Sequence, residues 1–151
     1  MKPRTKARGV ALQALYELDI TEHKIGEVMS SRFEHSDLSL ELQDFATLIV
    51  QRIVPIRKLL DKHIAIHAPE WPVDQISIID RNLIRIALWE FAVHTKTPTK
   101  VAINESIELA KHFGSDSTPR FVNGVLGSLA AQENDLRLSL KRSLEQIPPP
   151  E

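Results

Sequence analysis

Apolar residues recur along this chain at helical spacing, three or four positions apart, and no stretch shows the strict alternation of a half-buried strand. The first helix is expected to begin near Pro3, because proline is well tolerated in the first turn of a helix. A short second helix is expected from about residue 25 to 33. The apolar residues that would form the inner faces of these two helices are Ala7, Val10, Ala11, Ala14, Leu15 and Leu18, and then Ile25, Val28, Met29 and Phe33.

Prolines separate the helices predicted in the middle of the chain. A third helix would begin after Ser36 or Asp37, either of which is a good N-cap. Pro55 is expected to kink or break it, because proline removes a backbone donor and crowds the preceding turn. The helical pattern continues over 56–64, and the two prolines of 69–72 bracket a loop.

Cap and stop signals divide the C-terminal half. Asp74 is expected to cap a long helix, and Thr97-Pro98 to start the next one. Gly114 would end that helix in a left-handed conformation. Thr118-Pro119 would start a last helix that runs to about Gln146. The pattern therefore predicts an all-α protein with about seven helices packed as bundles.

Composition restricts the class of protein further. With 151 residues, 42% of them hydrophobic, we expect one domain over residues 1–147 and a disordered tail at 148–151. Cysteine is absent, which excludes disulfides and a cysteine nucleophile and agrees with a cytoplasmic protein. No apolar run approaches the roughly 18 residues of a membrane span. The net charge is −1, so nucleic-acid binding would need a local basic patch or a partner.

The N-terminus supplies such a patch. Lys2, Arg4, Lys6 and Arg8 have no acidic residue among them, and Arg4 and Arg8 lie one helical turn apart. Held on a packed helix, these side chains would face a phosphate backbone. The alternative is a solvated, frayed terminus, although positive charge is electrostatically disfavoured at a helix N-terminus.

The remaining polar residues indicate little chemistry. His63 and His67 have the spacing of a metal-binding pair, but no third ligand is evident, so both are interpreted as surface histidines. Asp80, judged by its chemistry alone, is interpreted as part of an ion pair that anchors its helix. Gly124 is interpreted as a site of close backbone approach. No glycine-rich phosphate loop or catalytic grouping is present, so we expect no enzyme, cofactor or metal.

Three segments of the sequence resemble the NusB family of transcription antitermination factors. They are RGVALQALY at 8–16, IDRNLIRIALWE at 79–90, and PTKVAINE at 98–105 with FVNGVL at 121–126. The resemblance covers about residues 3–130, and a leucine-rich helical extension at 131–147 falls outside it.

The resemblance implies an all-helical fold of two packed, perpendicular bundles and no catalysis. It implies a partner, NusE, which is also a small-subunit ribosomal protein. The pair would bind boxA-type RNA in ribosomal RNA transcripts, within the RNA polymerase antitermination complex.

The resemblance also assigns roles to individual residues. Arg4, Lys6 and Arg8 match a basic segment that contacts RNA. Arg120 and Phe121 match a basic residue and a phenylalanine near RNA, where the ring would stack on an unpaired base. Tyr16 and Asp80 match the surface that faces NusE, which replaces the ion-pair interpretation of Asp80. Gly127 and Ser117 depart from the family pattern, since relatives often carry aspartate there.

Two alternatives remain open. The protein would be a self-associating helical protein if Leu136, Leu140 and Leu144 formed a dimer interface. It would otherwise be a regulatory domain like the NusB-like domain of some ribosomal RNA cytosine methyltransferases, although this chain has neither a cofactor-binding domain nor a cysteine. We expect replacement of the basic N-terminal cluster by glutamine to weaken RNA binding without lowering the melting temperature.

Overall fold

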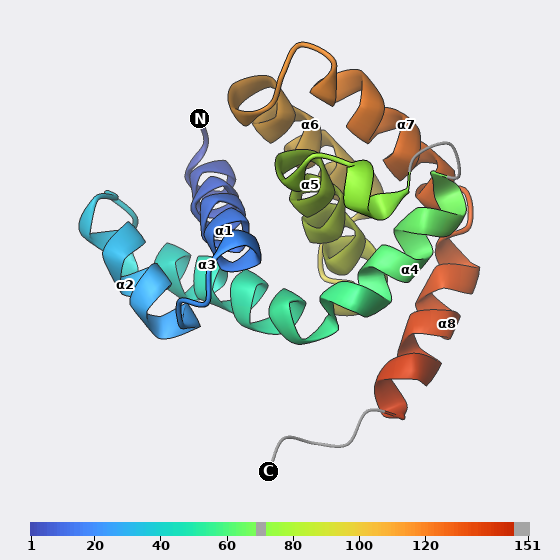
Figure 1. Cartoon of the computed structure of the whole chain (residues 1–151), viewed down its shortest axis with the longest axis horizontal. Helices are drawn as coiled ribbons and strands as arrows, with labels where there is room; N and C mark the ends of the chain where they lie inside the picture. The colour runs from blue at the N-terminus through green and yellow to red at the C-terminus, as the bar shows by residue number, and fades with distance from the viewer. Residues whose placement is uncertain (69–71, 147–151) are drawn as a thin grey trace.

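The computed structural model describes residues 1–68 and 72–146, and every regular element within these ranges is helical (Figure 1). The predicted all-α fold class is confirmed. Most of the predicted loop at 69–72 and the predicted tail at 148–151 lie outside the described residues. The α-helices are α1 (Pro3–Ile20), α2 (Ile25–Glu34), α3 (Leu40–Ile53), α4 (Arg57–His67), α5 (Ile78–Leu88), α6 (Thr99–Phe113), α7 (Thr118–Ala130) and α8 (Glu133–Glu145).

The helices form two groups joined by α1 (Figure 1). In the N-terminal group α1, α2 and α3 pack on one another, and in the C-terminal group α4, α5, α6 and α7 do so. Because α1 packs against both α3 and α5, the two predicted bundles share one core. α8 packs against a π-helical turn, η3 (Trp89–His94), that continues α5. None of the described helices has the length and apolar character that a membrane span requires.

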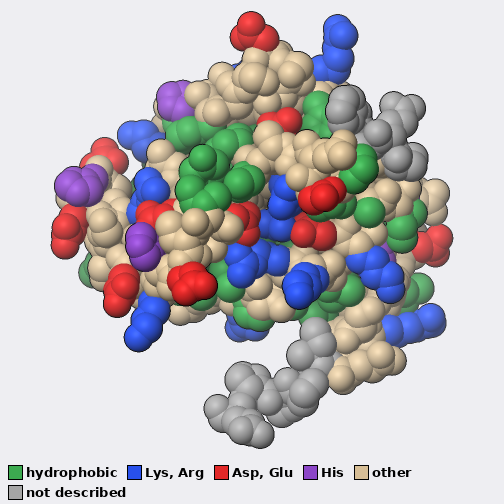
Figure 2. All heavy atoms as spheres, viewed as in Figure 1, with side chains coloured by type: hydrophobic (Ala, Val, Ile, Leu, Met, Phe, Trp, Pro, Cys, Tyr) green, Lys and Arg blue, Asp and Glu red, His purple; other side chains and the backbone are tan. Residues whose placement is uncertain are grey.

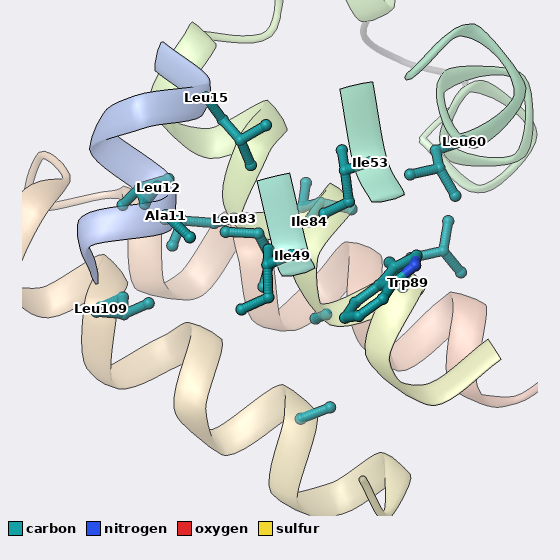
Figure 3. Packing of buried hydrophobic residues seen from close by; sticks show 14 of the residues in the cluster. Ala11, Leu12, Leu15, Ile49, Ile53, Leu60, Leu83, Ile84, Trp89 and Leu109 are labelled. Carbon is teal, nitrogen blue, oxygen red and sulfur yellow. The ribbon is translucent and has the colours of Figure 1, made fainter. Parts of the chain in front are cut away.

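The shared core lies where α1, α3 and α5 meet (Figure 3). Its large side chains are fully buried, and truncation of one such leucine to alanine typically costs about 2–5 kcal/mol of unfolding free energy. These contacts fix α1, and with it the basic N-terminus, against the rest of the molecule. The buried residues labelled in Figure 3 are Ala11, Leu12, Leu15, Ile49, Ile53, Leu60, Leu83, Ile84, Trp89 and Leu109.

Helix boundaries follow most of the predicted signals. Pro55 breaks the chain as predicted, because α3 ends before a short 3-10 turn, η1 (Val54–Ile56), and α4 begins after it. Asp74 does not cap α5, because it lies in a separate 3-10 turn, η2 (Val73–Gln75). Ser77 is the cap, and its hydroxyl accepts a hydrogen bond from the backbone N–H of Asp80 at 3.1 Å.

The predicted last helix is divided into α7 and α8. The chain leaves the helical conformation at Gln132, where φ is −112° and ψ is 28°. This break lets α8 turn back onto η3 and bury Leu136 and Leu140 within the same chain. The leucine stripe predicted as a possible dimer interface is therefore largely used inside the molecule.

Two glycines act differently from prediction. Gly114 has φ −91°, so it is not left-handed; a Cβ atom there would lie 2.5 Å from Cβ of Thr118. Close approach to Thr118 is therefore what requires a glycine. The packing interpretation of Gly124 is wrong, since a Cβ atom there would meet nothing within 4 Å. The close helix contact occurs at Gly9, whose Cβ would lie 3.2 Å from Cε2 of Phe113 in α6.

Candidate nucleic-acid interface

The exposed part of the basic N-terminus consists of Lys2, Arg4 and Lys6. The guanidinium carbon of Arg4 lies 4.0 Å from the centre of the Phe45 ring in α3, a cation–π contact that orients the side chain. Nζ of Lys6 lies 3.7 Å from a carboxylate oxygen of Asp37, and both side chains are well exposed, so that pair is weak. Both charges are therefore held on a packed helix and remain accessible to a ligand.

Arg8 lies at the base of this surface and is not open to solvent. Its side chain is 4% exposed, and its Nε and Nη2 donate to the two carboxylate oxygens of Glu90 at 2.9 and 2.8 Å. Glu90 is itself 1% exposed, which makes this a buried bidentate ion pair. The prediction that Arg8 lies open to an RNA phosphate is corrected: its hydrogen-bonding edge is occupied by a carboxylate of η3.

The pair belongs to a polar network that anchors the start of α1. Nη1 of Arg8 lies 3.6 Å from a carboxylate oxygen of Glu105, and that oxygen accepts a hydrogen bond from the Thr5 hydroxyl at 2.6 Å. The Thr97 hydroxyl donates to Glu90 at 3.1 Å. Buried charges need this degree of satisfaction to be tolerated. The network ties the segment that carries Arg4 to η3 and α6.

A second candidate surface brings together two residues that the sequence could not place side by side. Asp80 of α5 and Phe121 of α7 line one hollow of about 300 Å³, together with Ser117. A carboxylate oxygen of Asp80 accepts a hydrogen bond from the Thr118 hydroxyl at 2.8 Å. Phe121 is half-buried and the neighbouring Arg120 is exposed. A ring and a carboxylate from two different helices thus lie at one site, and Arg120 is not among the residues that line it.

Tyr16 lies elsewhere, on α1. It is 38% exposed and Ile20, one turn further on, is 54% exposed. Figure 2 shows hydrophobic side chains exposed over α1, and Lys and Arg side chains interspersed with Asp and Glu across the centre of the same face. Tyr16 is not among the residues that line the hollow at Asp80.

Comparison with known proteins defines the family. Residues 5–131 match the NusB family. The chain belongs to the NusB family. A transcription antitermination protein NusB from Dehalococcoides mccartyi is 43% identical over 127 residues, covering 84% of this chain and 89% of that protein.

Solved structures of NusB share the fold. T. maritima NusB superposes with a TM-score of 0.76 at 25% identity, covering 87% of this chain and 93% of that one. A crystal structure of the antitermination factors NusB and NusE in complex with dsRNA gives a TM-score of 0.78 at 23% identity. It covers 87% of this chain and 98% of the matched one. At that identity the second likeness concerns the fold alone.

In this NusB-family chain Asp80 has no arginine partner among the described residues, so the anchoring ion pair first inferred from its chemistry is wrong. Arg85 pairs instead with Asp61 at 2.6 Å and with Asp19 at 2.8 Å. Burial lowers the pKa of Arg85, but hydrogen bonds and charge attraction from Asp61 and Asp19 outweigh burial and raise it. These pairs join α1, α4 and α5 and leave Asp80 at the rim of its hollow.

The two histidines of α4 are not both on the surface. His63 is buried, and burial lowers the pKa of its imidazole. His67 is half-buried, with Nδ1 3.1 Å from the Ser128 hydroxyl oxygen in α7. Over residues 1–68 and 72–146, no group of three or more His, Asp or Glu side chains could hold a metal ion.

Sequence reasoning missed Glu90 and Lys96. Glu90 is a carboxylate between Trp89 and Phe91 in an apolar run, and a charge in that setting requires a buried partner. That signal was present in the sequence. Lys96 lines a hollow of about 530 Å³ together with Lys2 and Arg4, with Arg8 and the carboxylate residue Glu105 also in its lining. No spacing in the sequence could indicate that association, because it depends on how η3 packs beside α1.

Proposed function

We propose that this protein is a non-catalytic, RNA-binding transcription antitermination factor that acts together with NusE. Its target would be boxA-type RNA in ribosomal RNA transcripts, within the antitermination complex of RNA polymerase. Membership of the NusB family carries this proposal. Relatives that share about two fifths of their residues with it carry the name transcription antitermination protein.

The described surface supports a division of labour between RNA and protein partner. Arg4, Lys6 and Arg120 are exposed and would neutralise phosphates. Phe121 is half-buried beside an open hollow, so that its ring is fixed and would stack on an unpaired base. The near-neutral net charge favours weak RNA binding by the chain alone and tighter binding by a complex.

Tyr16 and Asp80 are the proposed contacts to NusE. The Tyr16 ring offers an apolar face with a hydroxyl group, a combination common at protein interfaces. Asp80 offers a carboxylate fixed by the Thr118 hydroxyl, to which a basic partner side chain would bind. Since Asp80 and Phe121 line the same hollow, NusE and RNA would meet there.

The deciding experiment measures RNA binding by fluorescence anisotropy at fixed salt. It compares this protein alone, its NusE counterpart alone, and the mixture, each with boxA-like and scrambled RNA. Tight, sequence-selective binding by the mixture only is the expected result. Equal weak binding in every sample would contradict the composite RNA-binding surface.

Variants separate the roles of the proposed residues. Arg4→Gln with Lys6→Gln should weaken RNA binding and make it less dependent on salt, by a slope of about 0.7 per lost phosphate contact. The control, Lys58→Gln with Lys141→Gln, removes two exposed charges on α4 and α8 and should leave binding unchanged. Arg8 is excluded from the test variant, because its loss would perturb the buried network.

A further inference from the structure

A second basic hollow lies beside the one that contains Lys2 and Arg4. It has a volume of about 470 Å³ and is bounded by the end of α3, by η1 and η3, and by Leu144 of α8. Lys96 lines both hollows, so they adjoin at this side chain. The positively charged surface therefore continues beyond the N-terminal cluster.

Its rim is cationic and its floor is apolar. Arg52, His94 and Lys96 line it, and none of its lining residues in the described part of the chain is acidic. Arg52 and Lys96 are exposed and form no ion pair with any described residue. Burial lowers the pKa of His94 and the charge of Lys96 lowers it further, the carboxylate of Glu90 acts in the opposite direction, and Arg52 again lowers it, so the three cationic side chains lie close enough to interact. An anion at this site would relieve that repulsion.

At the floor lies a pair of stacked rings, of which Trp89 is buried and His94 is half-buried. The Trp89 and His94 rings lie 4.5 Å apart with their planes at 11°. The π-helical turn η3 causes this, because it places residues five apart above one another. The turn ends at Thr95, whose φ of 59° is uncommon for a residue other than glycine. Such irregular turns persist where the surrounding contacts determine them, and they are frequent at functional sites.

We infer that this hollow, bounded by Arg52, His94 and Lys96, binds an unpaired nucleotide of the RNA as it leaves the N-terminal basic cluster. Phosphate would contact Arg52 and Lys96, and the base would lie on the apolar floor against the half-buried His94 ring, which stacks on the buried Trp89. The inference rests on the proposed RNA-binding function and extends it by one site. The hollow adjoins the N-terminal basic cluster at Lys96, and none of its described lining residues is acidic. These two features favour RNA over an acidic protein segment, because the peptide groups of such a segment would also need hydrogen-bond partners in the hollow.

The test compares boxA-like RNA with and without an unpaired extension of about six nucleotides at either end, a length within the site sizes of single-strand binding grooves. The protein is used as the full chain mixed with its NusE counterpart. For the extended RNA, Arg52→Gln with Lys96→Gln should weaken binding on the order of tenfold and reduce the salt slope by about 1.4. For the short RNA the same variant should bind like the unchanged protein. Lys58→Gln with Lys141→Gln is the charge-matched control.

Trp89 provides an independent readout. The chain has two tryptophans, so Trp71→Phe leaves Trp89 as the only one. Trp89 is buried but stacks on His94, so a base held against His94 should change its emission; the extended RNA should cause this change and the short RNA should not. If the Arg52 and Lys96 variant matches the control on extended RNA, or if NusE without RNA quenches Trp89, the hollow is not an RNA site. If the unchanged protein mixed with NusE binds neither RNA, the proposed function is overturned as well. The two outcomes therefore distinguish failure of this inference from failure of the proposed function.

Discussion

Arg4 and Arg8 lie one turn apart on α1, and burial gives their guanidinium groups different environments. Both lie over the Phe45 ring, at 4.0 and 5.2 Å from its centre, but Arg4 is exposed whereas Arg8 is sealed against Glu90. The same residue type therefore serves a surface in one case and the fold in the other. A charged side chain is assigned correctly only when its partner is known.

Removal of Arg8 should destabilise the protein. Arg8→Met leaves Glu90 buried without its cation, and loss of one member of a buried pair typically costs about 3–5 kcal/mol. Glu90→Met should have a similar effect. The double variant should recover much of the loss, because both charges are then gone. Urea denaturation of all four proteins gives the coupling energy, and simple additivity of the two losses would contradict the pairing.

Protonation of His63 should lower stability in mild acid. Burial lowers its pKa in the folded protein below the ordinary 6.5, and the charges of Lys62 and His67 lower it further. The unfolded chain therefore takes up a proton first as the pH falls. His63 contributes stability that is complete above about pH 6.5 and declines as the pH falls toward the folded-state value.

The measurement is the melting temperature between about pH 8 and pH 5, the range in which histidine titrates. His63→Gln should flatten the decline relative to the unchanged protein. Burial also lowers the pKa of His94, but His94 is present in both proteins. The difference between the two curves therefore reports on His63. Parallel curves would show that His63 does not contribute.

At the scale of elements, the junction between α6 and α7 sets the hollow at Asp80. Gly114 ends α6 in an extended conformation, which brings Thr118 close enough that no Cβ atom fits between them. Thr118 in turn donates to Asp80. A backbone requirement at one helix end thus positions a carboxylate on another helix.

Gly114→Ala should destabilise the protein by about 1–3 kcal/mol, the usual cost of an overpacked site. The matched control is Gly127→Ala in the exposed face of α7, where a Cβ atom would meet nothing within 4 Å. That change should stabilise the helix by up to about 1 kcal/mol, because alanine replaces glycine in a helix interior. Thermal unfolding of both variants should show changes in stability of opposite sign. Changes of equal sign and size would contradict the steric explanation.

At the scale of the whole molecule, the position of α8 determines whether its leucines pack within one chain or are free to bind a second copy. Leu136 and Leu140 are 4% and 0% exposed within one chain, because α8 lies against η3. Leu138 is the exposed leucine of the helix, at 54%. One isolated apolar side chain is normal on a monomer surface.

Leu140→Ala should therefore lower the free energy of unfolding by about 2–5 kcal/mol, as expected for a cavity in a packed core. Its sedimentation coefficient at several concentrations should equal that of the unchanged protein. Leu138→Ala is the control, and it should change neither quantity. A concentration-dependent coefficient that Leu140→Ala abolishes would restore the dimer interpretation.

The sequence by itself determined the elements and the family. Helical spacing of apolar residues, the break at Pro55 and the three matching segments were sufficient, because periodicity and local backbone preference are properties of neighbouring residues. It did not show that Ser77, and not Asp74, caps α5, that the predicted last helix is divided into α7 and α8, or that Gly124 has no packing role. Asp74 and Ser77 are competing caps a few residues apart, α8 is placed by its contact with η3, and the surroundings of Gly124 are set by helix packing, so helical periodicity did not distinguish these outcomes.

The tertiary structure alone decided which polar residues form a site. Burial placed Arg8 with Glu90, and helix packing placed Asp80 beside Phe121 and Lys96 beside Arg4 and Arg52. The physical reason is that a charge costs little in water and much in the core, so its role follows from its depth and its partner. Depth and partner are set by residues about 40 to 80 positions away along the chain, which local pattern does not encode.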